Sequence, residues 1–406
     1  MSPVFHHLRH RMRRPAILLG AGICALLLAG CSSLDSLNPL NLFSSGKKVK
    51  MAELPALQES ARLESLWSYS IGKAGDAVFY PAVTSNAVFV AAADGSLARL
   101  ENGVEKWRIK TGKPLSAGVG SDGERVAVGT RQGEVLVFSA HDGSPLWQAK
   151  MSSEILAPPL LENDMVIVRS GNNRVEALDT DGKRKWFYQH PTPSLSLRST
   201  APLIFADQFI LTGFPGGKLL ALSSQNGAPV WEGTVALPKG ATELERIADV
   251  VAPPAAAGPT GCAVAYQGRV TCFDFARSGN TLWSREMSSS AGLMVDGRSV
   301  YVTDDESAIH ALDISSGSSR WKMDKLLRRK LTAPLVMANG NYLALGDVEG
   351  YLHLIDKNNG ALVGRTKTDG TPILVMPLRL TGGQIIVQTK GGRVEALEVL
   401  EALEAR

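Results

Sequence analysis

The sequence predicts an all-β protein, an eight-bladed β-propeller built from four-stranded antiparallel blades. Two observations predict this fold: a repeat of about 40 residues marked by tryptophan, and short apolar strands that recur within the repeats. No helical period competes with these strands between residues 60 and 400. The tryptophans that mark the repeat are separated by 40, 40, 39, 45, 52 and 38 residues and stand at Trp67, Trp107, Trp147, Trp186, Trp231, Trp283 and Trp321.

The repeats present the same segments in the same order. A stretch of small residues or proline, such as "STAPL" (199–203), opens the unit, and two apolar strands follow, such as "QFILTG" (208–213) and "GKLLALS" (217–223). A glycine then stands four residues before the tryptophan, and after the last such glycine, Gly360, the tryptophan is replaced by Gly364. We interpret the tryptophans as buried core residues that pack one blade on the next.

The two ends of the repeat predict how the ring closes. The strand "GRVEALE" (392–398) has no tryptophan segment after it, whereas Trp67 has no such strand before it. The N-terminal strand near Trp67 is therefore expected to join the C-terminal blade, which pairs edges that would otherwise be bare. We place the propeller at 59–400 and a C-terminal tail at 401–406.

Residues 1–30 are predicted to be a secretory signal. Four arginines and no acid precede an apolar run at 16–29, and residues 28–33 read "LAGCSS". This segment resembles a bacterial lipobox, which implies cleavage before Cys31 and a lipid on Cys31. The serine that follows implies, by the same resemblance, an anchor in the outer membrane on its periplasmic face. An ordinary signal peptide with a chance cysteine is the alternative, and residues 31–58 are predicted to be a flexible tether.

The remaining composition argues against several classes of function. Removal of the signal leaves 39 basic and 39 acidic side chains, because four of the 43 bases and none of the 39 acids lie in it. This balance gives no electrostatic footprint for nucleic acid. The histidines outside the signal, at 141, 190, 310 and 353, lack metal-ligand spacing, and the acidic cluster "DDE" (304–306) is expected in a turn. We therefore predict no enzyme activity, no metal and no cofactor.

Cys262 and Cys272 are predicted to form a structural disulfide. They lie in "CAVAYQGRVTC", equidistant from Gln267 at the centre of a predicted hairpin, so they should face each other across two antiparallel strands. An oxidising periplasm would favour the bond. Two reduced, buried cysteines are the alternative.

Two long insertions fall in consecutive connections between the outer strand of one blade and the inner strand of the next. The tryptophan and the following "AP" are 15 and 21 residues apart there, compared with 10 and 12 in two other repeats. Because such connections share one face of a propeller, we expect a single patch. Leu195 and Leu197 should point to one side and Arg198 to the other. The second insertion should contain a short helical turn capped by Thr242.

The mixed apolar and charged composition of this patch is typical of a protein–protein site. An extended segment there could also add a strand to the sheet edge of a partner. The alternative is that the leucines pack beneath their own loop and only hold it in place.

The segment "ALDISSGSSRW" (311–321) resembles the tryptophan-docking repeat of the quinoprotein dehydrogenases. Two families share that repeat with eight blades: the quinone-dependent enzymes, and the BamB lipoproteins of the outer-membrane β-barrel assembly machinery. The chain lacks the adjacent cysteines that the alcohol dehydrogenases of the first family carry over the cofactor. Lipobox, length and blade count together resemble the BamB family.

That resemblance implies a non-catalytic periplasmic scaffold, monomeric within a hetero-complex, that assists assembly and insertion of outer-membrane proteins. It implies docking on the POTRA domains of the barrel-inserting subunit BamA through Leu195, Leu197, Arg198 and Asp249, and contact with unfolded outer-membrane proteins. Val251 stands where the family carries a second aspartate. Three alternatives stay open at this stage: a quinone-dependent dehydrogenase-like propeller, an adhesin or cell-wall-binding propeller, and a quality-control lipoprotein without a stable complex.

Overall fold

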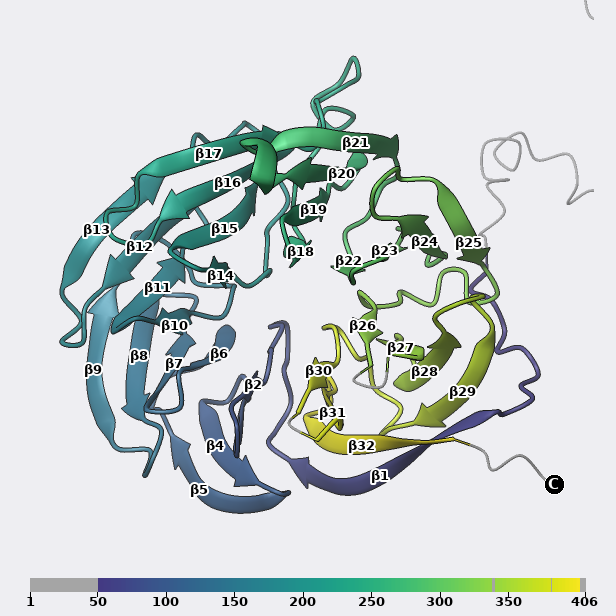
Figure 1. Ribbon diagram of the computed structural model, residues 1–406. Coiled ribbons are helices and arrows are strands. Elements are labelled where there is room, and N and C mark those ends of the chain that lie inside the picture. The colour runs from purple at the N-terminus through teal and green to yellow at the C-terminus, as the bar shows by residue number, and fades with distance from the viewer. Residues whose placement is uncertain (1–49, 338–339, 381, 402–406) are drawn as a thin grey trace, which may run out of the picture. The chain divides into compact units, whose positions relative to one another are not determined.

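The structure, a computed structural model, describes residues 50–337, 340–380 and 382–401. Within these residues the strands form eight four-stranded antiparallel sheets, and the one short 3₁₀ helix is η3 (Phe275–Arg277). Figure 1 shows the sheets arranged as the blades of a ring. The predicted all-β, eight-bladed propeller is therefore confirmed.

The first seven blades each contain four strands that are consecutive in the chain. Blade 1 contains β2 (Ala82–Val83), β3 (Val88–Ala91), β4 (Ser96–Glu101) and β5 (Val104–Lys110), and blade 2 contains β6 (Ala117–Ser121), β7 (Arg125–Gly129), β8 (Glu134–Ser139) and β9 (Pro145–Lys150). Blade 3 contains β10 (Leu160–Glu162), β11 (Met165–Arg169), β12 (Arg174–Leu178) and β13 (Arg184–Gln189), and blade 4 contains β14 (Ile204–Ala206), β15 (Phe209–Phe214), β16 (Lys218–Ser223) and β17 (Pro229–Thr234). Blade 5 contains β18 (Ala255–Ala257), β19 (Thr260–Val264), β20 (Arg269–Asp274) and β21 (Asn280–Glu286), and blade 6 contains β22 (Gly292–Val295), β23 (Ser299–Thr303), β24 (Ile309–Asp313) and β25 (Ser319–Met323). Blade 7 contains β26 (Leu335–Val336), β27 (Tyr342–Gly346), β28 (Tyr351–Asp356) and β29 (Leu362–Lys367).

The eighth blade joins the two ends of the propeller. Its strands are β30 (Leu378–Arg379), β31 (Ile385–Gln388), β32 (Arg393–Glu401) and β1 (Ala61–Ser70), in the order β1-β32-β31-β30. β1 pairs antiparallel with β32, with Trp67 opposite Ala396, and Figure 1 shows both strands at the bottom of the ring. The predicted closure by the strand near Trp67 is confirmed.

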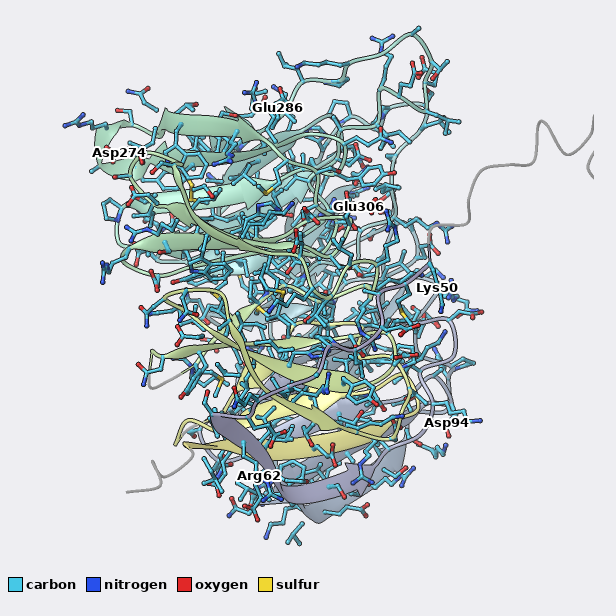
Figure 2. All side chains as sticks on the ribbon, turned by 90° about the vertical axis from the view of Figure 1, so that its right-hand side faces the viewer. Lys50, Arg62, Asp94, Asp274, Glu286 and Glu306 are labelled. Atoms are coloured by element: carbon cyan, nitrogen blue, oxygen red, sulfur yellow. A yellow bond between two sulfur atoms is a disulfide. The ribbon has the colours of Figure 1, made fainter. Side chains whose placement is uncertain are left out.

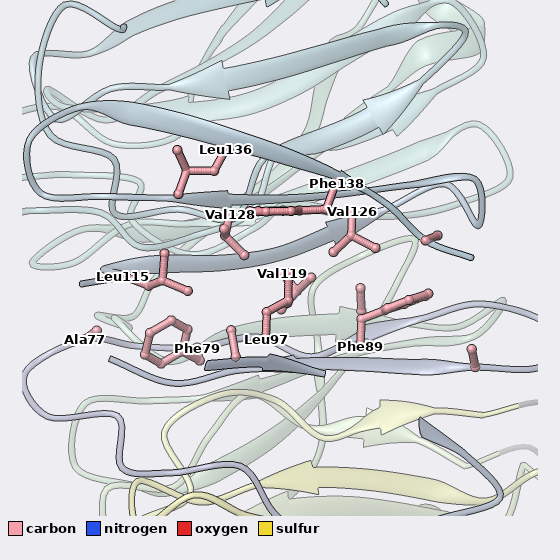
Figure 3. Close-up of a cluster of buried hydrophobic side chains, with 14 of the residues drawn as sticks. Ala77, Phe79, Phe89, Leu97, Leu115, Val119, Val126, Val128, Leu136 and Phe138 are labelled. Carbon is pink, nitrogen blue, oxygen red and sulfur yellow. The ribbon is translucent and has the colours of Figure 1, made fainter. Parts of the chain in front are cut away.

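Neighbouring blades pack through apolar side chains that are almost completely removed from water. Figure 3 shows Phe89 and Leu97 of blade 1 opposite Val126, Val128 and Leu136 of blade 2. Each of these five side chains is at most 4% exposed. Burial of one such side chain contributes about 1.5–3 kcal/mol, so the blade interfaces are a main source of the stability of the ring.

The tryptophans dock each blade on the turn of the next. A Cβ atom built on Gly182 would lie 2.7 Å from the Trp147 ring, and one on Gly227 would lie 2.4 Å from the Trp186 ring. Glycine is therefore required at these turns, and the predicted blade-to-blade packing is confirmed. The expectation of full burial is wrong for six of the seven rings, because only Trp186, at 8%, is buried and the others keep a partly exposed edge.

The start of β1 lies against Gly364, the position that lacks the eighth tryptophan. The carbonyl oxygen of Ala61 lies 2.3 Å from where a Cβ of Gly364 would be. The Ser60 N–H donates to the Val363 carbonyl at 3.0 Å, and the Ala52 N–H donates to the Leu327 carbonyl at 3.0 Å. Ala52 and Pro55, which we predicted as part of a flexible tether, therefore contact the connection before blade 7 and blade 7 itself, and β32 extends to residue 401.

The cysteines of blade 5 are joined. Cys262 on β19 pairs with Cys272 on β20, and their sulfur atoms form a disulfide within one hairpin. Both residues are completely buried, and Gln267 occupies the left-handed region at the turn with φ of 48°. The bond therefore cross-links two strands of one blade, and both cysteines also pack against apolar side chains of blade 6.

The predicted signal at 1–30 and the lipidation site Cys31 lie outside the described residues. Among the residues that are described, no helix has the length and hydropathy needed to cross a membrane.

Candidate docking surface

The candidate surface is built from two loops that join neighbouring blades. The first loop, residues 190–203, connects β13 to β14, and the second, residues 235–254, connects β17 to β18. The second loop extends beyond the ring above β21 in Figure 1, and it projects on the side of Asp94 in Figure 2, opposite to Asp274. Both loops therefore add length to the same kind of connection, as the sequence predicts.

Hydrogen bonds fasten the two loops to each other. The Leu197 N–H donates to Asp249 Oδ2 at 2.7 Å, and the Ser199 hydroxyl donates to the Val251 carbonyl at 3.2 Å. Nearer the tip, the Ser194 hydroxyl donates to a Glu243 carboxylate oxygen at 2.8 Å. The predicted single patch is therefore confirmed, because the loops touch along their length.

Three residues of the first loop face outward to different extents, and we call Leu195, Leu197 and Arg198 the docking patch. Leu195 is 44% exposed, whereas Leu197 is half-buried. The Arg198 side chain is 68% exposed and pairs with Glu154 of the preceding connection at 2.9 Å. An exposed pair of this kind contributes about 0–1 kcal/mol, so a carboxylate on a partner could replace Glu154 at little cost.

Asp249 lies beneath the docking patch. The residue is 1% exposed, and its two carboxylate oxygens accept from the backbone N–H groups of Leu197, at 2.7 Å, and Gly216, at 3.0 Å. We predicted Asp249 as a contact for a partner, but the structure turns its carboxylate inward, where it holds the backbone of the first loop. Val251, in the position of the second family aspartate, contributes its backbone carbonyl to the same contact between loops.

The tip of the second loop is stiffened by a capping box. The Glu245 N–H donates to the Thr242 hydroxyl at 3.2 Å, and Glu245 Oε2 accepts from the N–H groups of Ala241 and Thr242 at 2.8 and 3.1 Å. These backbone donors lower the pKa of Glu245. The predicted helical turn capped by Thr242 is therefore confirmed, although the return bond from Glu245 was missed.

Two leucines near this tip were also missed by sequence reasoning. Leu237 and Leu244 are 65% and 66% exposed, the highest values among the large apolar residues that the structure describes. The signal that could have found them is the presence of two leucines in a long insertion, between Gly233 and Pro253, that lies outside the expected strands. Together with Leu195 they give the two loops an exposed apolar surface.

The acidic cluster 304–306 serves the fold. The Asp304 carboxylate accepts from the N–H groups of Glu306 and Ala308 at 3.0 and 2.8 Å in the turn between β23 and β24, as expected for a turn. Its other oxygen lies 2.8 Å from His310 Nε2. Burial is the largest single influence and raises the pKa of Asp304, but the hydrogen bonds from His310 and the backbone together bring that pKa below its usual value. Within the described residues, no group of His, Cys, Asp and Glu is arranged to hold a metal ion.

Comparison with known proteins gives one consistent family. The family model described as outer membrane protein assembly factor BamB matches residues 93–323. The curated protein of that name from Bordetella pertussis is 39% identical over 371 residues, which cover 90% of this chain and 93% of the relative. The one from Escherichia coli is 32% identical over 390 residues, with 92% and 98% covered. These relatives are named as assembly factors and not as enzymes.

Solved structures agree with this result. The crystal structure of BamB from Moraxella catarrhalis superposes with a TM-score of 0.77 at 26% identity and covers 83% of this chain and 99% of that one. A quinohemoprotein alcohol dehydrogenase from Comamonas testosteroni has a TM-score of 0.66 at 13% identity, with 82% and 76% covered. At that identity the second likeness shows the propeller fold alone.

Proposed function

We propose, since this chain belongs to the BamB family of outer membrane protein assembly factors, that it acts as a non-catalytic scaffold that assists assembly and insertion of outer-membrane proteins. It would be anchored to the outer membrane by a lipid on Cys31 and would face the periplasm. Its partner would be a BamA-type subunit, bound through POTRA domains, and unfolded outer-membrane proteins would be its clients.

The observation that supports this proposal is the docking patch on two loops that are fastened together. Leu195 offers an apolar contact in the middle of a polar loop, and Arg198 offers a cation whose present ion pair is exposed. Apolar and arginine anchors within a charged rim are typical of protein–protein contacts. Because the loops are held by hydrogen bonds, little conformational entropy would be lost when a partner binds.

The test is a pull-down of the membrane-extracted lipoprotein beside its Arg198→Glu variant. The substitution reverses the charge and places a second carboxylate next to Glu154, so a partner acid would be repelled. Arg277→Glu is the matched control, because the Arg277 side chain is 82% exposed and pairs with Asp274 at 3.7 Å, on the side of the ring opposite to the second loop. Thermal melts confirm that both variants are folded.

We expect a barrel protein with POTRA domains to be recovered with the native chain and with Arg277→Glu, but not with Arg198→Glu. Recovery with all three proteins would place the contact elsewhere on the propeller. Absence of any such partner from the native pull-down would refute the scaffold function.

A further inference from the structure

We propose that Arg169, a buried arginine beneath the docking patch, is a positioning residue for that patch and acts together with Asp249. The inference rests on the proposed docking function and names the internal groups that hold the contact residues in place. Arg169 is 6% exposed and Asp249 is 1% exposed, so neither side chain is placed to touch a partner. Their effect on docking would pass through the backbone of the first loop.

Arg169 ties two neighbouring blades together below the loops. It is the last residue of β11 in blade 3, and its Nη1 donates to the Thr212 hydroxyl of blade 4 at 3.3 Å. Its guanidinium carbon lies 5.0 Å from the centre of the Phe214 ring, also of blade 4, which is a favourable cation–π distance. The guanidinium is therefore held at the junction from which both loops leave the ring.

Asn173 carries this network to the start of the first loop. Arg169 Nη2 donates to Asn173 Oδ1 at 3.2 Å, and Asn173 Nδ2 donates to the Thr192 hydroxyl at 3.2 Å. The Asn173 carbonyl accepts from the His190 N–H at 3.2 Å. Asn173 has φ of 62°, a left-handed conformation that asparagine tolerates better than most residues. The orientation of one buried arginine thus determines where residues 190–192 are held.

Asp249 holds the other end of the first loop and balances the charge of Arg169. Burial lowers the pKa of Arg169 to about 10, and attraction to Asp249 opposes that shift. The Asp249 carboxylate in turn accepts from the N–H groups of Leu197 and Gly216. Removal of the Asp249 carboxylate would leave the N–H groups of Leu197 and Gly216 without their acceptor, and removal of Arg169 would take a favourable opposite charge away from buried Asp249.

The second loop brings Asp249 to this position because it is seated directly on blade 4. A Cβ atom on Gly213 would lie 2.3 Å from Val250 Cγ1, so only glycine allows the approach. The Val250 N–H donates to the Phe214 carbonyl at 3.3 Å. The segment that carries Asp249 therefore lies next to the residues that Arg169 contacts, and the two loops share one buried support.

The experiment measures hydrogen exchange of the Leu197 and Gly216 amides in the full chain without a partner. Arg169→Met and Asp249→Asn are compared with Arg277→Met, which removes an arginine that is 82% exposed from blade 5. We expect the first two variants to speed exchange by about tenfold or more, because a hydrogen bond to a buried charge is lost or misaligned, and the control to leave it unchanged. Both should weaken binding to a soluble fragment of POTRA domains by a similar factor.

Unchanged exchange in Arg169→Met and Asp249→Asn would overturn the inference, and weakened binding by Asp249→Asn alone would then make Asp249 a direct contact. Thr192→Val guards against a variant that does not fold, because it removes the outermost bond of the network and leaves the buried charges in place; it should speed exchange at Leu197 by a smaller factor. If Arg198→Gln leaves binding intact while the exchange results hold, the proposed docking site fails and the positioning network stands.

Discussion

The packing of each tryptophan on the turn glycine of the next blade predicts the effect of Gly227→Ala. Gly227 has φ of 71°, and an added Cβ would lie 2.4 Å from Cε3 of Trp186. The substitution therefore strains the backbone and also pushes the indole away from its site. That site includes a hydrogen bond from Trp186 Nε1 to the Ser224 carbonyl at 2.8 Å, which the movement would weaken.

The size of the effect follows from two separate contributions. An alanine in the left-handed region costs about 1–2 kcal/mol. Overpacking against a buried ring costs about 1–3 kcal/mol more, because Trp186 is enclosed and cannot move without displacing its neighbours. The free energy of unfolding should therefore fall by about 2–5 kcal/mol, which for a propeller of this size corresponds to a loss of roughly 3–7 °C in Tm.

Gly112→Ala separates the two contributions in a thermal melt. Gly112 has φ of 76°, but an added Cβ there would meet no described heavy atom within 4 Å. Its Tm should fall only by the backbone contribution, so Gly227→Ala should be the more destabilising of the two. Equal Tm losses in the two variants would refute the role of glycine in tryptophan docking. Combining Gly227→Ala with Trp186→Leu should be less than additive, since the smaller side chain relieves the clash.

Three further predictions concern buried groups: the disulfide of blade 5, Arg329 in the connection before blade 7, and His353 of blade 7. Replacing both Cys262 and Cys272 by alanine should lower the free energy of unfolding by about 2–3 kcal/mol, since the bond closes a loop of 10 residues. In melts, reductant should destabilise the native chain by the same amount and should leave the double variant unchanged. Arg329→Met should lower the free energy of unfolding by about 3–5 kcal/mol, because the completely buried Asp347 loses a partner at 2.7 Å. Arg328→Met removes only an exposed ion pair and should lower it by about 1 kcal/mol or less. Similar denaturation midpoints for the two variants would contradict this difference. Burial lowers the pKa of His353, so the folded state binds fewer protons than the unfolded chain and stability should fall as the pH drops below about 6.5. His353→Gln should flatten that dependence in melts between pH 7 and 5.5, and an unchanged slope would exclude His353 as its source.

The number of blades and the closure of the ring could be predicted because they depend on local patterns that repeat. A tryptophan that packs on the next turn requires glycine there, and that requirement appears in the sequence as a fixed spacing of four residues. The disulfide could be predicted for a similar reason, because the two cysteines are symmetric about a hairpin turn at Gln267.

Other features could not be predicted because they depend on what covers each residue. The segment 52–58 has no sustained period, yet Ala52 and Pro55 are held by the connection before blade 7 and by blade 7. Leu237 and Leu244 are side chains of a type common in cores, but in the described part of the chain they remain 65% and 66% exposed.

The propeller, its closure and the location of the two long loops could be read from the sequence alone, because strand alternation and turn chemistry act between residues that are close in the chain. Which loop residues face outward depends on packing between segments that are distant in the chain, so it could be seen only in the folded structure. Leu197 and Asp249 are 52 residues apart, and whether the carboxylate meets a partner or an internal N–H depends on how two loops and two blades pack together. An aspartate in a polar loop is therefore a surface residue by composition and a buried support by its contacts.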